Sequence, residues 1–138
     1  MYLLINNLED DKNYLALILD KSAKKYFFLT LKNKRGQDNN ILKGLDNLLL
    51  KANKRLKDVK GIIVVNGPGS FVGIRVALSV ANTLAWLLKV PVVGLKNGDK
   101  FDLIKIGIKK LNKKTKTVRP FYGKLPNISQ PKEFCLRH

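Results

Sequence analysis

The residues best arranged to bind an anion are Gly67, Gly69 and Ser70, in the segment GIIVVNGPGSFVGIR. An apolar run of the kind found in buried strands turns here through glycines into an apolar helix. Unpaired backbone N–H groups and the helix dipole at such a point attract phosphate. The spacing G-x-G-x-x-x-G misses the dinucleotide fingerprint by one residue, and no G-K-[ST] follows for a P-loop. A second interpretation stays open, in which the glycines only permit a tight turn and Ser70 only caps the helix.

Catalytic side chains are scarce in this sequence. The only cysteine, Cys135, and the only histidine, His138, stand near the end of the chain. A disulfide, a metal site or a nucleophile–base pair cannot be built from them. Glu9, Asp10 and Asp11 fall in an expected hairpin tip, where solvated acids are ordinary. We therefore expect neither a catalytic centre nor a bound metal.

The elements that must position the glycine turn begin with three short apolar runs, at 2–5, 14–19 and 26–31. Connections of hairpin length separate them and predict an antiparallel meander. Residues 41–56 then carry apolar side chains at helical spacing, with Asp38 or Asn39 as an expected N-cap.

The second half of the expected domain surrounds the glycine turn. A doubly buried strand at 61–65 leads through the turn into a helix at 71–88, and a short strand follows at 91–95. Residues 99–111 predict a helix, although Ile104, Ile106 and Ile108 also alternate as in a strand. This order describes an α/β domain with a mixed sheet over residues 1–111, followed by a basic, proline-containing tail at 112–138.

A stripe of small residues, Gly73, Ala77, Ala81 and Ala85, recurs every four positions along the second helix. Such a stripe allows another element to approach closely. Either this domain covers every face of the helix, or a partner protein completes one face, and the pattern alone does not choose between them.

The formal charge is +17, from 27 Lys and Arg against 10 Asp and Glu. Such an excess favours encounter with nucleic acid, although lysine richness also follows genome composition. The N-terminus lacks the basic segment of a signal peptide, and the most apolar stretch, at 76–88, is shorter than the roughly 20 residues of a membrane span. We therefore expect a cytoplasmic protein without a membrane segment.

The stretch GPGSFVGIRVALSVANTLAWLLKVPVVGL resembles the GPGSFTGLR-and-helix signature of the TsaB (YeaZ-like) family. Near the end, VRPFYGKLPNI resembles the closing pattern of that family. The resemblance implies an actin-like ATPase-type, ribonuclease H-like domain, with most of the family's second domain missing. It also implies a non-catalytic scaffold subunit of the complex that makes threonylcarbamoyladenosine in tRNA.

The partners implied by the resemblance are a TsaD-type transferase and a TsaE-type ATPase, with the cytoplasm as the compartment. A homodimer through the same helices is expected when the partner is absent. No cofactor is expected to bind tightly, but ATP or ADP held at the junction with the partner would lie near Gly67, Gly69, Ser70 and Arg75. The resemblance points to the following interface residues: Leu45, Leu48, Leu49, Gly73, Ala77, Ala81 and Leu84.

Two departures from the family pattern affect this interpretation. Where typical members carry an Asp-Thr-Ser phosphate loop, this chain reads Asn6, Asn7 and Leu8 followed by three acids, which disfavours nucleotide binding. The resemblance also leads us to expect that most of the family's C-terminal domain is missing, so that one half of a cleft would stand alone.

Two rival functions remain at this stage. One is a freestanding RNA-binding domain, which lacks the interleaved aromatics of RRM or OB surfaces. The other is a small nucleotide-hydrolysing enzyme, for which the sequence offers no base. If the chain is a scaffold subunit or an RNA-binding domain, its basic segment is expected to lie near RNA. The residues of that segment are Lys109, Lys110, Lys113, Lys114, Lys116 and Arg119.

Overall fold

The computed structural model describes residues 1–8, 13–31, 41–111 and 118. A five-stranded mixed sheet forms its centre, with the strand order β3-β2-β1-β4-β5. Strands β1 (Tyr2–Asn6), β2 (Asn13–Ile18) and β3 (Tyr26–Leu31) make the expected antiparallel meander. Strands β4 (Gly61–Gly67) and β5 (Val92–Lys96) run parallel to β1, so the carboxyl ends of β1, β4 and β5 share one edge.

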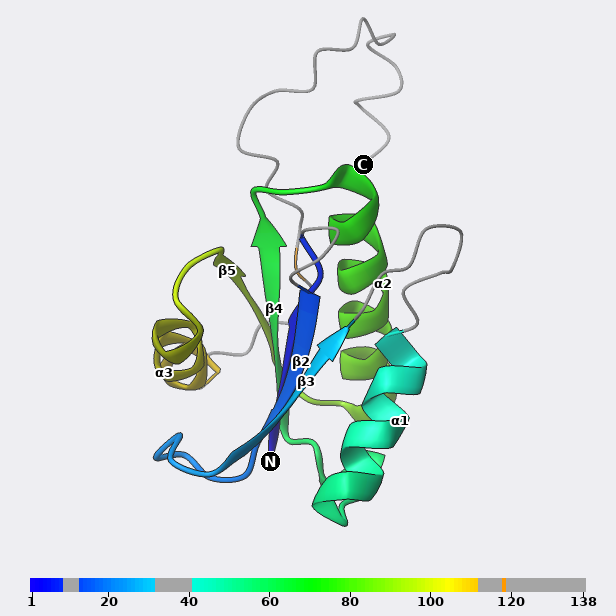
Figure 1. The fold of residues 1–138 in the computed structure, drawn as a ribbon, viewed down its shortest axis with the longest axis vertical. Coiled ribbons are helices and arrows are strands. Elements are labelled where there is room, and N and C mark those ends of the chain that lie inside the picture. Colours follow the sequence, from blue (N-terminus) through cyan, green and yellow to red (C-terminus); the bar gives the residue numbers. More distant parts are fainter. Residues whose placement is uncertain (9–12, 32–40, 112–117, 119–138) are drawn as a thin grey trace, which may run out of the picture.

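Helices cover both faces of this sheet (Figure 1). Helices α1 (Ile41–Ala52) and α2 (Phe71–Leu88) lie side by side on one face, and α3 (Lys100–Lys110) lies on the other. Strands β1 and β4 are buried on both faces, which explains their continuous apolar runs. The expected α/β domain with a mixed sheet is therefore present.

The first helix is shorter than its periodicity predicts. The spacing of apolar residues continues to Leu56, but α1 ends at Ala52 because Asn53 adopts a left-handed conformation with φ 54°. The N–H of Lys54 then bonds to the carbonyl of Leu49 at 3.0 Å, which is a common way to close a helix. Leu56 instead begins a 3-10 turn, η1 (Leu56–Asp58). The expected N-cap residues Asp38 and Asn39 lie outside the described residues.

The other helices follow their sequence signals closely. Ser70 caps α2 through its hydroxyl, which accepts a hydrogen bond from the Gly73 N–H at 3.3 Å. Asp99 caps α3 in the same manner, by accepting from the Phe101 N–H at 3.1 Å. The helical interpretation of 99–111 is confirmed over the alternating one. The helix packs on the sheet through Gly107, which lies against the Ile63 side chain.

Candidate functional site

The glycine turn between β4 and α2 is pressed against the connection that leaves β1. The Ser70 N–H donates to the Leu8 carbonyl at 2.8 Å, and a Cβ on Gly69 would stand 2.7 Å from the Leu8 Cβ. Gly67 has φ 130°, a conformation that side chains rarely permit. The glycines therefore allow two backbones to pack at close range, as the purely structural interpretation of this turn requires.

Several N–H groups at the start of α2 bond within the chain. The Gly73 N–H donates to the Ser70 hydroxyl, and the Ile74 N–H donates to the Ser70 carbonyl at 2.9 Å. Arg75, the remaining residue of the predicted nucleotide-proximal set, lies exposed in the first turns of α2. The structure thus brings Gly67, Gly69, Ser70 and Arg75 to one end of the helix, and a nucleotide near them stays a prediction.

A row of amides lies at the same edge of the sheet. The Asn6 side-chain amide donates to the Asn97 Oδ1 at 3.4 Å, and the Gly98 N–H donates to that oxygen at 3.0 Å. Beside Asn6 stands Tyr14, whose buried hydroxyl makes no hydrogen bond of ordinary geometry within the described part of the chain. Burial raises the pKa of Tyr14 above its usual value, and the adjacent Asn6 lowers it by less. The Asn6–Asn97 hydrogen bond ties the end of β1 to the residues that follow β5.

The structure corrects the predicted partner-interface residues. Their large and small side chains point into the core of this chain and are between 0 and 6% exposed: Leu45, Leu48, Leu49, Ala77, Ala81 and Leu84. Gly73 is partly exposed, but its Cα faces the Asn7 backbone. The reason is that the small stripe of α2 packs on the sheet, chiefly against β4. It allows close helix–sheet approach, and it is not an outer surface.

The outward side of α2 is apolar as well, through residues that the sequence analysis did not name. Val72, Val76, Thr83 and Leu87 stand at i, i+4, i+11 and i+15 and therefore share one side of the helix, opposite Ala81. Trp86 lies beside them and is 77% exposed. Helix α1 adds Leu42 and Leu50, both largely exposed. We call these exposed residues of α1 and α2 the outer apolar face: Leu42, Leu50, Val72, Val76, Trp86 and Leu87.

The sequence did contain a signal for this face. Its helix at 71–88 is apolar on every side, which is typical of a helix that is buried all round. By length and composition it is the one helix in the described ranges that could cross a membrane, and a third of it is buried in the fold. The core helix of a soluble protein passes the same test. The apolar side chains of α2 are thus divided into one set that packs on the sheet and another set that faces outward.

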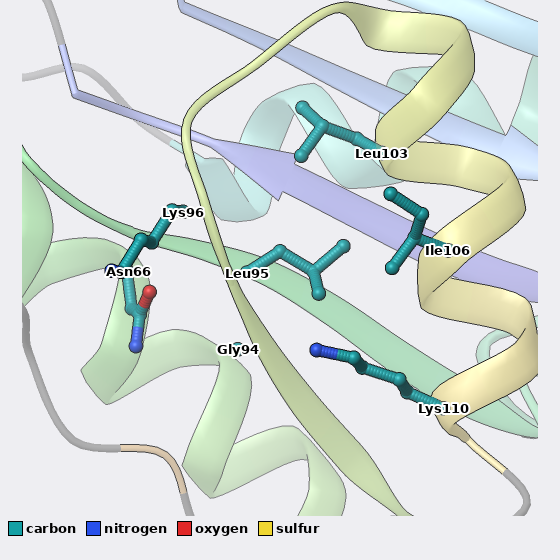
Figure 2. A pocket seen from close by; sticks show the side chains of 7 residues that line it. All are labelled: Asn66, Gly94, Leu95, Lys96, Leu103, Ile106 and Lys110. Atoms are coloured by element: carbon teal, nitrogen blue, oxygen red, sulfur yellow. The ribbon is translucent and has the colours of Figure 1, made fainter.

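A hollow of about 420 Å³ opens between β5 and α3, shown in Figure 2. Leu95, Leu103 and Ile106 form its apolar wall, and Lys110, one of the predicted RNA-proximal residues, reaches over it from the last turn of α3. Lys109 is exposed beside it. The other predicted residues of that set lie outside the described residues: Lys113, Lys114, Lys116 and Arg119.

The single described residue of the predicted tail, Val118, is held against the domain. The Asn82 amide donates to the Val118 carbonyl at 3.1 Å, and the Val118 N–H donates to the Asn82 Oδ1 at 2.9 Å. The Val118 side chain lies against Gly94 of β5. Asn82 therefore binds this point of the chain as a neighbouring strand would.

The described ranges contain no cluster of metal-ligating side chains. Within them, no group of three His, Cys, Asp or Glu residues could hold a metal ion. Cys135, His138 and the acids at 9–11 lie outside those ranges. Three features of the described ranges are therefore candidates for function: the packed glycine turn, the polar edge of the sheet and the outer apolar face.

Comparison with known proteins identifies relatives of this fold. The family model TsaD, tRNA N6-adenosine threonylcarbamoyltransferase, matches residues 32–100, which is half of the chain. A protein of Persephonella marina with that enzyme name is 37% identical over 59 residues, which are 43% of this chain and 17% of the relative.

Two curated relatives carry the name tRNA threonylcarbamoyladenosine biosynthesis protein TsaB. The protein of Buchnera aphidicola is 36% identical over 40% of this chain and 26% of its own length. The protein of Bacillus subtilis is 38% identical over 33% of this chain and 23% of its own length. The matched stretch therefore spans only about a quarter of these relatives.

Solved structures agree with the expected fold. YeaZ from Pseudomonas aeruginosa superposes with a TM-score of 0.58 and 25% identity, over 70% of this chain and 43% of that one. A second structure, described as similar to peptidase YEAZ from the same organism, superposes with a TM-score of 0.56 at 24% identity. The actin-like, ribonuclease H-like fold expected from the resemblance is confirmed, and the chain covers part of it. The chain belongs to the family that the TsaD model describes, and within it is a TsaB/YeaZ-like protein.

Proposed function

We propose that this chain is a non-catalytic scaffold subunit in the biosynthesis of threonylcarbamoyladenosine in tRNA, acting in the cytoplasm by binding a TsaD-type transferase. Its family and the names of its TsaB relatives support a role in this modification. In this proposal the partner carries out the transfer. The chain binds and stabilises that partner.

The observation that carries the proposal is the outer apolar face. Isolated soluble proteins seldom expose several large apolar side chains on one surface, and such patches usually mark an interaction site. Here Val72, Val76 and Leu87 continue along a full 18-residue helix, with Trp86 beside them. A partner that covered this side would complete the burial of α2.

The shape of the face favours a helical partner. Helices α1 and α2 lie side by side (Figure 1), and a partner helix can pack along such a pair by fitting its side chains between theirs. Trp86 and Phe71 are exposed aromatic side chains on α2, and large aromatics of this kind commonly anchor an interface. Helices of a TsaD-type subunit packed against them would form a helical bundle.

The beginning of α2 suggests where a nucleotide would lie in such an assembly. Gly67, Gly69 and Ser70 form the turn beside Phe71, and Arg75 is exposed one turn further along. ATP or ADP held mainly by the partner would meet these residues at the junction. A TsaE-type ATPase would join the same assembly, and the face left open without a partner would support a homodimer.

The test is to mix the purified chain with a TsaD-type subunit from the same source and to measure complex mass by light scattering and affinity by calorimetry. Trp86→Ala is expected to weaken association at least about thirtyfold, as removal of an interface anchor does. Val76→Arg is expected to abolish association, because it places a charge in an apolar contact.

The matched control is Ile106→Ala, which also removes an exposed apolar side chain but from α3, on the other side of the sheet. It should bind as the unaltered chain does. Equal affinity of the Trp86→Ala, Val76→Arg and unaltered proteins would rule out this face, and the absence of any complex would end the scaffold proposal.

A further inference from the structure

Aromatic side chains from three elements gather on the side of the sheet opposite α1 and α2. Tyr14 and Phe28 lie with their ring centres 5.0 Å apart, and Tyr26 meets Phe101 of α3 edge-on at 6.2 Å. Tyr14, the pair Tyr26 and Phe28, and Phe101 come from separate parts of the sequence and gather only in the fold. We call Tyr14, Tyr26, Phe28 and Phe101 the aromatic platform.

The platform stays partly open because α3 does not extend over it. Helix α3 packs on β4 and β5, while Tyr26 and Phe28 lie on β3 at the far edge of the sheet. Phe101 is 52% exposed, and the side chains of Tyr26 and Phe28 are partly exposed. The platform is therefore partly accessible to a ligand.

A lysine stands at the centre of the platform. The Lys100 Nζ lies 4.0 Å from the ring centre of Phe28, 5.3 Å from Phe101 and 5.8 Å from Tyr26. Attraction between the ammonium and the ring faces holds this charge in place. Lys100 lies closest to Phe28, so the rings that we consider for stacking are those of Phe101 and Tyr26, whose centres lie further from the ammonium.

Further positive charge surrounds the platform. The β2–β3 connection and α3 with its cap carry seven lysines against three aspartates. Phe101, Lys105 and Lys109 recur at intervals of four and so follow one line of the helix. Lys24 and Lys25 are exposed at the start of β3.

The three aspartates keep their negative charge, so they offset only part of this positive field. Asp20 accepts a hydrogen bond from the Ser22 hydroxyl at 2.7 Å, which lowers the pKa of Asp20, and Asp99 is engaged as the cap of α3. Asp102 is exposed. The surplus of lysine remains on the surface that carries the platform.

We propose that this surface binds unpaired nucleotides of RNA, with bases stacked on Phe101 and Tyr26 and phosphates beside Lys100, Lys105 and Lys109. Rings that stack with bases, combined with lysines that follow the backbone, are the usual means of holding a single strand. A paired helix hides its base faces, so the platform favours unpaired positions. The choice of RNA as the bound strand rests on the proposed function. The binding surface itself is inferred from the positions of the rings and lysines.

The experiment measures fluorescence anisotropy of a labelled single-stranded RNA, and of the matching duplex, with the purified full chain. Phe101→Leu keeps apolar bulk but removes the ring, and it should weaken single-strand binding roughly tenfold. Lys100→Gln should weaken binding and reduce the slope of log affinity against log salt by about 0.7. The single strand should bind more tightly than the duplex.

Two controls separate this site from general charge. Ile106→Ala removes an exposed apolar residue from the same helix, and Lys51→Gln removes a charge from the exposed end of α1. Both should leave RNA affinity unchanged. Unchanged affinity in Phe101→Leu, or equal binding of the duplex, overturns the inference. Binding to the TsaD-type subunit is measured separately, so the proposed function can still be tested if RNA does not bind at this site.

Discussion

The side-chain amide of Asn7 donates a hydrogen bond of 3.1 Å to the Gly73 carbonyl, while the Asn7 carbonyl oxygen occupies the space in which a Gly73 side chain would begin. The connection after β1 and the first turn of α2 are thus joined twice, at positions 66 residues apart. Related proteins were expected to carry a phosphate loop at the position of Asn7. In this chain Asn7 instead packs against Gly73 in the first turn of α2.

Gly73→Ala should therefore destabilise the fold by about 1–3 kcal/mol, because a methyl group there would overlap a backbone oxygen that cannot move alone. Urea unfolding followed by circular dichroism measures the change. Gly98→Ala is the matched control, since a Cβ at Gly98 would meet nothing within 4 Å. Equal stability of the two variants would contradict the close Asn7–Gly73 approach.

Neighbouring positions on α2 should respond oppositely to arginine. Ala77 is fully buried against the sheet, so Ala77→Arg should cost more than about 4 kcal/mol and prevent folding. Val76 is 38% exposed on the outer apolar face, so Val76→Arg should fold normally. Thermal unfolding and soluble yield distinguish the two. A well-folded Ala77→Arg protein would mean that the small stripe faces outward.

The Tyr14 hydroxyl should make stability depend on alkaline pH. Burial raises the pKa of Tyr14 in the folded state, so the folded chain retains the proton longer than the unfolded chain. Stability should be complete below the unfolded pKa near 10 and decline as pH rises toward the folded value.

Tyr14→Phe tests this effect directly. At neutral pH it should be neutral or mildly stabilising, because the buried hydroxyl has no hydrogen bond of ordinary geometry. Urea midpoints for both proteins at pH 8 to 11 should diverge only at the alkaline end. A parallel decline in both would assign the alkaline loss to other groups.

Asn82 should protect the Val118 amide from hydrogen exchange. Asn82→Ala removes both hydrogen bonds to Val118, and amide exchange at Val118 should then accelerate at least tenfold. Asn82→Asp retains an acceptor for the Val118 N–H and loses only the donor, so it should keep most of the protection. Equal exchange in all three proteins would show that the contact is not maintained in solution.

Much of the fold could be read from local pattern. Three apolar runs with short connections predicted the meander, and the uninterrupted apolar run before the glycine turn predicted a strand buried on both faces. Ser70 was identified as the cap of α2 for a local reason, because a hydroxyl bonds to the N–H three residues ahead. The end of α1 was missed because Asn53 leaves the helix while the apolar spacing continues.

Which side of α2 faces outward was decided only by tertiary structure. A helix that is apolar all round has no periodic signal to orient it, and its small stripe packs equally well on a sheet or on a partner. In the structure the alanine side of α2 packs on the sheet, chiefly against β4, because small side chains allow close approach. Trp86 and Val72 are therefore exposed to solvent. The aromatic platform likewise exists only after strands β2 and β3 pair and the sheet places the start of α3 beside them, because only long-range contacts bring Phe28 and Lys100 together.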